Sequence, residues 1–171
     1  PNTMWHERRP HSTSFTHKLA SFFSGLGTWS IANEALHGIT TTAVDSDKNM
    51  HTIHNAYLPN VVTRLEDVNR LNRAEGYVDS DIDVSTGSFP CQPFSSLTWR
   101  PPGSTVWDDA RTEPLLRFLI TIAVTQPKTV ILEAVPNLAK IDGGTAMYHI
   151  LRALKSMGYI TDVTTRQAAR L

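Results

Sequence analysis

The alternation of short apolar segments with helical segments is the feature that most constrains the fold of this chain. Apolar runs typical of strands occupy residues 19–23, 40–44, 82–86, 129–135 and 159–165. Segments with helical spacing, several of them ended by Gly or Pro, occupy residues 29–38, 48–60, 113–127 and 146–158. Strands that alternate with helices predict crossover connections and a mostly parallel sheet with helices on both faces. The sequence therefore predicts an α/β fold.

The length, net charge and hydrophobic pattern of the chain limit the classes of protein to which it can belong. Its 171 residues are enough for one domain with a sizeable core. Lys and Arg together number 16, as do Asp and Glu, so the net charge is zero. That balance argues against nucleic-acid binding by bulk charge alone. No apolar run approaches the roughly 20 residues of a membrane helix, and no secretory signal is visible, so we expect an intracellular protein without a membrane partner.

The amino-terminal residues differ from the rest. Residues 1–17 are polar and without periodicity, so we expect a leader or linker before a single domain at 18–171. The three histidines of this leader lack the spacing of metal ligands. His51 and His54 stand three apart on a predicted helix, where a solvated helix face is the better interpretation. The sequence predicts no metal site.

A glycine turn follows the first predicted strand. The sequence there is FFSGLGTW, in which Gly25 and Gly27 allow a tight turn and a close approach of the backbone to a ligand. An acid about 20 residues after such a turn can accept hydrogen bonds from a ribose. Asp45, with Ser46 beside it, ends the second predicted strand at that spacing. The glycine pattern is not the full dinucleotide-binding motif. The sequence therefore favours an adenosine-containing ligand other than a dinucleotide.

The single cysteine of the chain follows the third predicted strand. Cys91 lies in GSFPCQPFS, where Pro90 and Pro93 stiffen the loop at the strand end, the edge at which parallel sheets bind ligands. Glu133 follows the next strand in the same way. The alternatives are a small buried cysteine and a carboxylate that merely faces water. The order of glycine turn, acid, cysteine and glutamate favours a functional site.

These motifs resemble those of the cytosine-C5 methyltransferases that use S-adenosylmethionine, from about Leu19 to Tyr159. FFSGLG is similar to the cofactor turn of that family, AVDSD to its ribose-binding strand end, LEDV to its adenine-contacting segment and GSFPCQPFS to its nucleophile loop. The resemblance implies the class I methyltransferase fold, a Rossmann-like sheet. It also implies a set of cofactor-binding residues: Phe23, Gly25, Leu26, Gly27, Asp45, Ser46, Asp67, Val68 and Pro90.

The resemblance implies a reaction as well. The thiol of Cys91 would add to C6 of a cytosine in double-stranded DNA, which makes C5 rich in electrons and able to accept a methyl group. Glu133 would hold and protonate N3. The cytosine would have to be flipped out of the helix, as in the enzymes of restriction–modification systems. The loop after the cysteine would contact DNA through Gln92, Ser95 and Arg100, while Trp99 and Trp107 would contact bases or pack.

Two departures from the family pattern stand out. The family has Glu-Asn-Val where this chain has Glu133-Ala134-Val135, so the hydrogen bonds of that Asn are missing. The Arg-rich strand, the target-recognition region and the last helix of the family are also absent, and neither Arg166 nor Arg170 matches the Arg-rich pattern. The resemblance therefore implies a fold truncated at its carboxyl end, in a fragment or one piece of a split enzyme that a carboxyl-terminal segment or chain would complement.

Two alternative functions remain open at this point. One is the tRNA-methylating branch, whose motif resembles Pro-Pro-Cys-Gln-Pro-Phe-Thr, whereas Phe89 and Ser95 favour the DNA enzymes. The other is a catalytically inactive binding or regulatory module. Ala134 and the missing regions favour that module, and the intact Cys91 and Glu133 argue against it.

Overall fold

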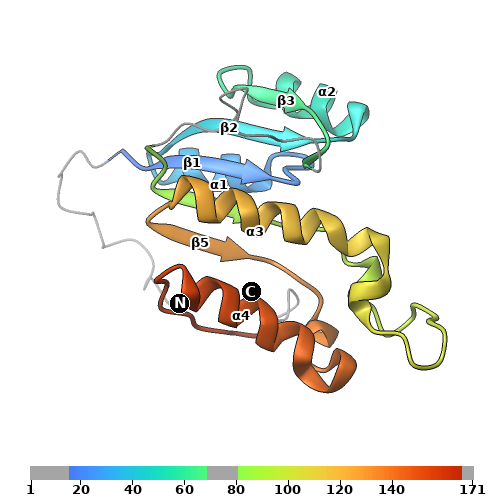
Figure 1. Ribbon diagram of the computed structural model, residues 1–171. Coiled ribbons are helices and arrows are strands. Elements are labelled where there is room, and N and C mark those ends of the chain that lie inside the picture. The colour runs from blue at the N-terminus through green and yellow to red at the C-terminus, as the bar shows by residue number, and fades with distance from the viewer. Residues whose placement is uncertain (1–15, 69–80, 167–171) are drawn as a thin grey trace, which may run out of the picture.

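The computed structural model describes residues 16–68 and 81–166, which form one parallel sheet with helices on both faces (Figure 1). The strands are β1 (Lys18–Phe22), β2 (Ile39–Asp45), β3 (Thr63–Leu65), β4 (Val84–Gly87) and β5 (Thr129–Leu132). The α-helices are α1 (Thr28–Ala35), α2 (Lys48–Tyr57), α3 (Glu113–Thr125) and α4 (Thr145–Ser156).

The strand order is β3-β2-β1-β4-β5, and every neighbouring pair is parallel. The chain therefore starts in the middle of the sheet, builds outward through α1 and α2, and then returns to build outward on the other side of β1. Because crossover connections are right-handed, this reversal places helices on opposite faces. Figure 1 shows α3 and α4 in front of the sheet and α1 behind it. The predicted α/β fold with a parallel sheet is confirmed.

The core lies between the sheet and α3. Phe22 of β1 and Phe118 of α3 are both fully buried, and their rings meet edge to face with centroids 5.2 Å apart. A Cβ atom at Gly87 of β4 would lie 2.9 Å from the Phe118 ring. The glycine at this strand end therefore lets α3 pack closely against the middle of the sheet.

The helix boundaries follow local sequence signals. The Asp47 carboxylate caps α2 by accepting hydrogen bonds from the backbone N–H groups of Asn49 and Met50, at 2.7 and 3.2 Å. α3 has Pro114 in its first turn and ends at Gln126, which has φ 47° and precedes Pro127. Both helices lie inside their predicted ranges.

One predicted strand is wrong, and one observed strand was not predicted. Residues 159–165 have no strand structure. The Tyr159 hydroxyl donates to the Pro127 carbonyl at 2.7 Å, and Ile160 is fully exposed. The fifth strand is instead β3, whose three residues extend the sheet beyond β2.

The predicted solvated histidine face of α2 is also wrong for one of its two members. The His54 side chain is 1% exposed, whereas His51 is half-buried and its ring contacts the Thr63 hydroxyl at 3.0 Å. His54 lies under the glycine turn, because a Cβ atom at Gly27 would be 2.9 Å from its Nε2 atom. Gly27 has φ 87°, so this position requires glycine for both its backbone conformation and its contact with His54.

The remaining expectations on domain organisation stay predictions. Most of the predicted leader at 1–17 falls outside the described residues. Within the described ranges, no helix is both long and apolar enough to cross a membrane.

We expect His54 to make the stability of the fold depend on pH. Burial lowers the pKa of His54 below 6.5; His51 acts in the same direction and Asp45 in the opposite one. The unfolded chain therefore binds a proton at His54 more readily than the folded chain, so stability is complete above pH 6.5 and falls as the pH drops below it. Urea unfolding at about pH 7.5 and about pH 5.5 measures this loss.

The matched control is His54→Gln, which keeps a polar side chain of similar size but does not titrate. The variant should lose less stability between the two pH values than the unmodified chain. An equal loss in both proteins would show that other groups cause the pH dependence.

Candidate active site

The site lies at the carboxyl end of the sheet, where the chain reverses direction. β1 has β2 on one side and β4 on the other, so the loops after β1 and β4 lead to opposite faces, and the edge between them is the usual ligand site of such sheets. The indole Nε1 of Trp29, in the first turn of α1, donates to the Ser88 hydroxyl at 3.1 Å. This bond joins the glycine turn to the cysteine loop across 59 residues.

The glycine turn carries three left-handed backbone conformations. Phe23 has φ 55°, Gly25 φ 51° and Gly27 φ 87°. For a bulky residue such as Phe23 this conformation costs about 1 to 3 kcal/mol, and such strain clusters at ligand sites. A Cβ atom at Gly25 would have no atom within 4 Å, so the turn faces open space on that side. The backbone at Gly25 is therefore accessible to a ligand.

Asp45 joins this turn to the end of β2. Its Oδ2 accepts a hydrogen bond from the Gly25 backbone N–H at 2.7 Å, and its Oδ1 accepts one from the Asp47 N–H at 2.9 Å. The two bonds fix the carboxylate beside the open face of the turn, and each oxygen keeps a lone pair for a further donor. A fixed acceptor next to an accessible glycine backbone fits the ribose of an adenosine ligand.

The other predicted cofactor residues lie around this edge with different exposures. Leu26 is 51% exposed and Ser46 is exposed, so both are open to a ligand. Asp67 and Pro90 are half-buried. Val68 is 5% exposed and packs in the main core, which leaves its side chain little surface for a ligand. Their contacts with a cofactor stay predictions.

The cysteine loop is held by two buried aromatic rings. Phe89 and Phe94 flank Cys91, are 4% and 0% exposed, and meet edge to face with centroids 5.4 Å apart. The Phe94 backbone N–H donates to the Cys91 carbonyl at 3.0 Å and starts a short 3₁₀ turn at Gln92–Phe94. Because both rings are anchored in the core, the thiol lies at the exposed tip of a fixed loop.

Glu133 lies one residue beyond β5. Its backbone N–H donates to the Gly87 carbonyl at 3.0 Å, and Gly87 pairs with Leu132 in the β4–β5 register. Glu133 is therefore level with Ser88, three residues before Cys91. The Glu133 side chain is exposed. The structure thus brings the predicted nucleophile and the predicted acid to neighbouring loops at one edge of the sheet.

Asn137 joins these two loops, although no sequence pattern predicted a role for it. Its side-chain Nδ2 donates to the Phe94 carbonyl at 2.8 Å, across 43 residues. That carbonyl belongs to the 3₁₀ turn after Cys91, and Asn137 lies four residues after Glu133. Ala134, in the position of the family Asn, packs against the core instead. Asn137 therefore supplies a side-chain bond between the nucleophile loop and the acid loop.

The loop after Cys91 is tied back to the loop after Glu133. The predicted DNA contact Arg100 is 21% exposed, and its Nη1 lies 3.7 Å from the Asp142 carboxylate. The other oxygen of Asp142 accepts the Val106 backbone N–H at 2.6 Å. Arg100 would have to leave Asp142 to bind phosphate, and this contact stays a prediction, as do those of Gln92, which is exposed, and Ser95, which is half-buried.

The two tryptophans of this loop differ in how far they are exposed. Trp99 is 80% exposed. Trp107 packs against the core, and its ring meets His149 of α4 edge to face with centroids 6.0 Å apart. Of the two interpretations for these residues, packing therefore describes Trp107, and a base contact is open only to Trp99.

An ion pair fixes the chain between this loop and α3. Arg111 donates to both carboxylate oxygens of Asp109, with Nη2 2.6 Å from Oδ2. The Arg111 guanidinium holds the pKa of the Asp109 carboxyl below its usual range. Both groups thus stay charged and paired near neutral pH. Among the residues that the structure describes, no group of three His, Cys, Asp or Glu side chains is arranged to hold a metal ion.

Comparison with known proteins gives the family. The model for the C-5 cytosine-specific DNA methylases matches residues 17–170. This chain belongs to that family. S-adenosylmethionine is the cofactor of these methylases, and the Gly25–Asp45 turn described above fits its adenosine part.

The curated relatives are Type II methyltransferases. The chain is 27% identical over 158 residues to the Type II methyltransferase M.PspPI of Psychrobacter sp., which covers 92% of this chain and 36% of that protein. It is 37% identical over 79 residues to the Type II methyltransferase M.BsuFI of Bacillus subtilis, over 46% of this chain and 18% of that protein. The chain therefore spans about a third or less of the length of these relatives.

Solved structures agree on the fold. A prophage-encoded protein of E. coli, described as a DNA modification methyltransferase, has a TM-score of 0.67 at 23% identity over 82% of this chain and 38% of its own. A variant of Spodoptera frugiperda DNMT2 has a TM-score of 0.60 at 18% identity over 85% of this chain and 42% of its own. At these identities the likeness shows the fold alone, which is the predicted class I methyltransferase fold.

We expect Asp45→Ala to weaken S-adenosylmethionine binding by about 1 to 3 kcal/mol, because the ribose and the Gly25 N–H both lose an acceptor. Titration calorimetry on the complete protein measures the loss. Asp47→Ala is the matched control, since Asp47 caps α2 two residues away and should change the stability more than the affinity. Unchanged affinity in Asp45→Ala would mean that the ribose is held elsewhere.

We expect Asn137→Ala in the complete protein to slow single-turnover methyl transfer by about tenfold, the equivalent of one lost hydrogen bond between the loops. Asn137→Asp keeps the size but cannot donate to the Phe94 carbonyl, so it should be at least as slow. Cofactor affinity should change little in both variants. A fast Asn137→Asp variant would show that the bond does not position the cysteine loop.

Proposed function

We propose that this chain supplies the cofactor crevice, the nucleophile and the acid of a DNA cytosine-C5 methyltransferase. The observation that carries the proposal is the exposed Cys91 on a loop fixed by Phe89 and Phe94, next to the loop that bears Glu133. The same edge of the sheet holds the open glycine turn and Asp45. A nucleophile, an acid and a cofactor crevice at one edge are the parts that methyl transfer to a ring carbon requires.

Cys91 would act first. Cytosine C5 is a weak nucleophile, so the reaction needs a group that adds to C6 and pushes electron density onto C5. The Cys91 thiolate forms the S–C6 bond, and the electrons of the C5–C6 double bond move toward C5. An exposed thiol on a fixed loop suits this step because the sulfur must reach the face of the base without a rearrangement of the backbone.

Glu133 would donate a proton to the ring. Addition at C6 builds negative charge in the ring, and a proton placed on N3 by the Glu133 carboxyl offsets it. When bound, S-adenosylmethionine supplies an electrophilic methyl group, which the electron-rich C5 accepts. A base then removes the C5 proton, the C5–C6 double bond forms again, the Cys91 sulfur leaves C6 as thiolate, and the N3 proton returns to Glu133.

The substrate follows from the chemistry and the family. C5 and C6 are not accessible inside a stacked duplex, so the target cytosine has to turn out of the helix into the crevice. The chain spans only part of its relatives, and we infer that target recognition and much of the DNA contact come from the remaining carboxyl-terminal portion, in the same or a complementing chain. The activity is therefore tested on the complete protein.

We expect Cys91→Ser to abolish methyl transfer and leave cofactor binding unchanged, because a serine hydroxyl is similar in shape but far less ionised. Transfer of tritium from labelled cofactor to duplex DNA measures the activity. Glu133→Gln should slow transfer by about 100-fold or more, since its amide cannot donate the proton. Near-normal methylation by Cys91→Ser would refute the assignment of the nucleophile.

A covalent trap separates the proposed function from its alternatives. A duplex with 5-fluorocytosine at the target should be captured by the wild-type protein as an adduct that survives denaturation, because fluorine at C5 blocks the release of the cysteine. Cys91→Ser should capture none. No adduct with DNA, but an adduct with a fluorinated tRNA, would favour the tRNA branch. No adduct with either would favour an inactive module.

A further inference from the structure

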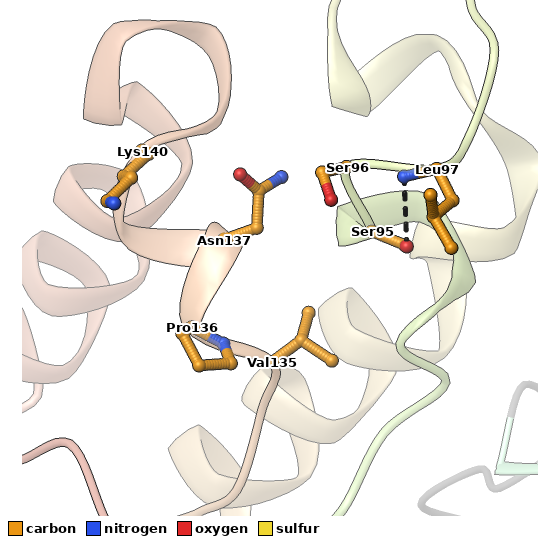
Figure 2. A pocket seen from close by; sticks show the side chains of 7 residues that line it. All are labelled: Ser95, Ser96, Leu97, Val135, Pro136, Asn137 and Lys140. Carbon is orange, nitrogen blue, oxygen red and sulfur yellow. Dashed lines mark hydrogen bonds between the residues drawn. The ribbon is translucent and has the colours of Figure 1, made fainter.

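A hollow of about 370 Å³ lies between the loop after Cys91 and the loop after Glu133 (Figure 2). Ser96 and Leu97 form one wall, and Asn137 and Lys140 lie across from them. The remaining lining residues are Ser95, Val135 and Pro136. The hollow therefore begins four residues after the nucleophile and two residues after the acid.

The hollow offers hydrogen-bond donors, one of them a cation, beside the acceptor oxygen of the Asn137 amide. The Ser95 hydroxyl accepts the Leu97 backbone N–H at 3.2 Å and keeps its proton for another acceptor. Ser96 is exposed with its hydroxyl toward the hollow. Lys140 is exposed, and its ammonium forms no ion pair with any residue in 16–68 or 81–166. No carboxylate lines the hollow.

Lys140 differs in this respect from the nearby arginines. Arg100 lies 3.7 Å from Asp142, and Arg111 is paired with Asp109 at 2.6 Å. Both guanidinium groups are thus partly neutralised by a neighbouring carboxylate. Among the seven described residues that line the hollow, Lys140 is the one cation, and no ion pair engages it.

We propose that this hollow binds the sugar–phosphate backbone of the DNA strand that carries the target cytosine, with the Lys140 ammonium on a phosphate. The inference rests on the proposed function and adds a subsite to it. A phosphate needs a cation and hydroxyl donors, which Lys140, Ser95 and Ser96 provide. Leu97, Val135 and Pro136 give an apolar surface for a deoxyribose.

The lining favours the backbone over a base. None of the seven lining side chains is aromatic, so the hollow has no stacking surface for a base. Its position next to both catalytic loops means that a strand whose cytosine reaches Cys91 has its neighbouring phosphates close to the hollow. A phosphate held there would fix the strand while the base turns out, without reading the sequence.

The test is the salt dependence of DNA binding by the complete protein. Loss of one phosphate contact should make the slope of log K against log salt less negative by about 0.9. We expect this change in Lys140→Gln, by the same amount on several duplex sequences. Lys140→Arg should keep the wild-type slope, and so should the control Lys155→Gln, which removes an exposed lysine from α4 outside the hollow. An unchanged slope in Lys140→Gln, or an equal change in Lys155→Gln, would overturn the proposal.

Methylphosphonate substitution identifies the strand. One phosphate at a time is made neutral around the cytosine that the wild-type protein methylates. One such substitution on the target strand should weaken wild-type binding and leave Lys140→Gln binding unchanged. The inference is wrong if the phosphate whose neutralisation weakens binding lies on the other strand. It is also wrong if every substitution that weakens wild-type binding weakens Lys140→Gln binding equally.

The two proposals fail in different ways. A protein that traps 5-fluorocytosine but shows no Lys140-dependent slope keeps the proposed function and loses this subsite. A protein that traps nothing loses the proposed function, and the slope measurement then decides the phosphate contact by itself. A protein that does not bind DNA at all overturns both.

Discussion

The pairing of β1 with a parallel strand on each side is the constraint on which the rest of the site depends. Phe22, the last residue of β1, pairs with Val44 of β2 and with Gly87 of β4, and Gly87 pairs with Leu132 of β5. β1, β4 and β5 therefore end at one level and β2 ends one residue later, at Asp45, so all four ends lie at the same edge. This register brings together the glycine turn, Asp45, the cysteine loop and Glu133, although they are spread over more than 100 residues of sequence.

Much of this could be predicted because the signals are local to strand ends. β1, β2 and β5 carry apolar runs followed by glycine, acid or proline, so the sequence predicted their position to within a few residues. β3 has three residues and no periodicity, and it forms only because the edge of β2 offers partners for it. Residues 159–165, in contrast, were predicted as a strand and do not form one. Their Tyr, Ile, Val and Thr residues suit a strand, but Ile160 is fully exposed and Val163 is 51% exposed, and no described strand pairs with them.

The missed features of the site depend on contacts between distant residues. The Asn137 bond to the Phe94 carbonyl spans 43 residues, and an asparagine after a proline in a loop is ordinary in isolation. His54 belongs to a helix face that is polar by sequence, yet the missing Cβ of Gly27 lets the turn cover it. Ala134 removes the amide that the family pattern places after the acid. The structure offers Asn137, three residues later, as a tether between the same two loops.

The charge of the site is arranged locally, which is how a chain without net charge would suit the DNA substrate that we propose. Carboxylates partly neutralise Arg100 and Arg111 at this edge, so the electrostatic potential there depends on which of these ion pairs can open. The ion pair between Arg100 and Asp142 is long, at 3.7 Å, and stabilises the fold less than a direct hydrogen bond would. Asp142 does not need it, because the Val106 N–H donates to its other oxygen at 2.6 Å.

Asp142 is thus anchored to the loop whether or not Arg100 is present. Its φ of 50° is tolerated by aspartate, whose short side chain can bond locally in this conformation. Release of Arg100 to a phosphate would therefore leave the loops after Cys91 and Glu133 joined through Asp142 and Val106, and through Asn137 and Phe94. Lys140 needs no release, because no described carboxylate engages it. For the phosphate contacts that we propose, Lys140 is thus available at first contact, and Arg100 only after its pair with Asp142 has opened.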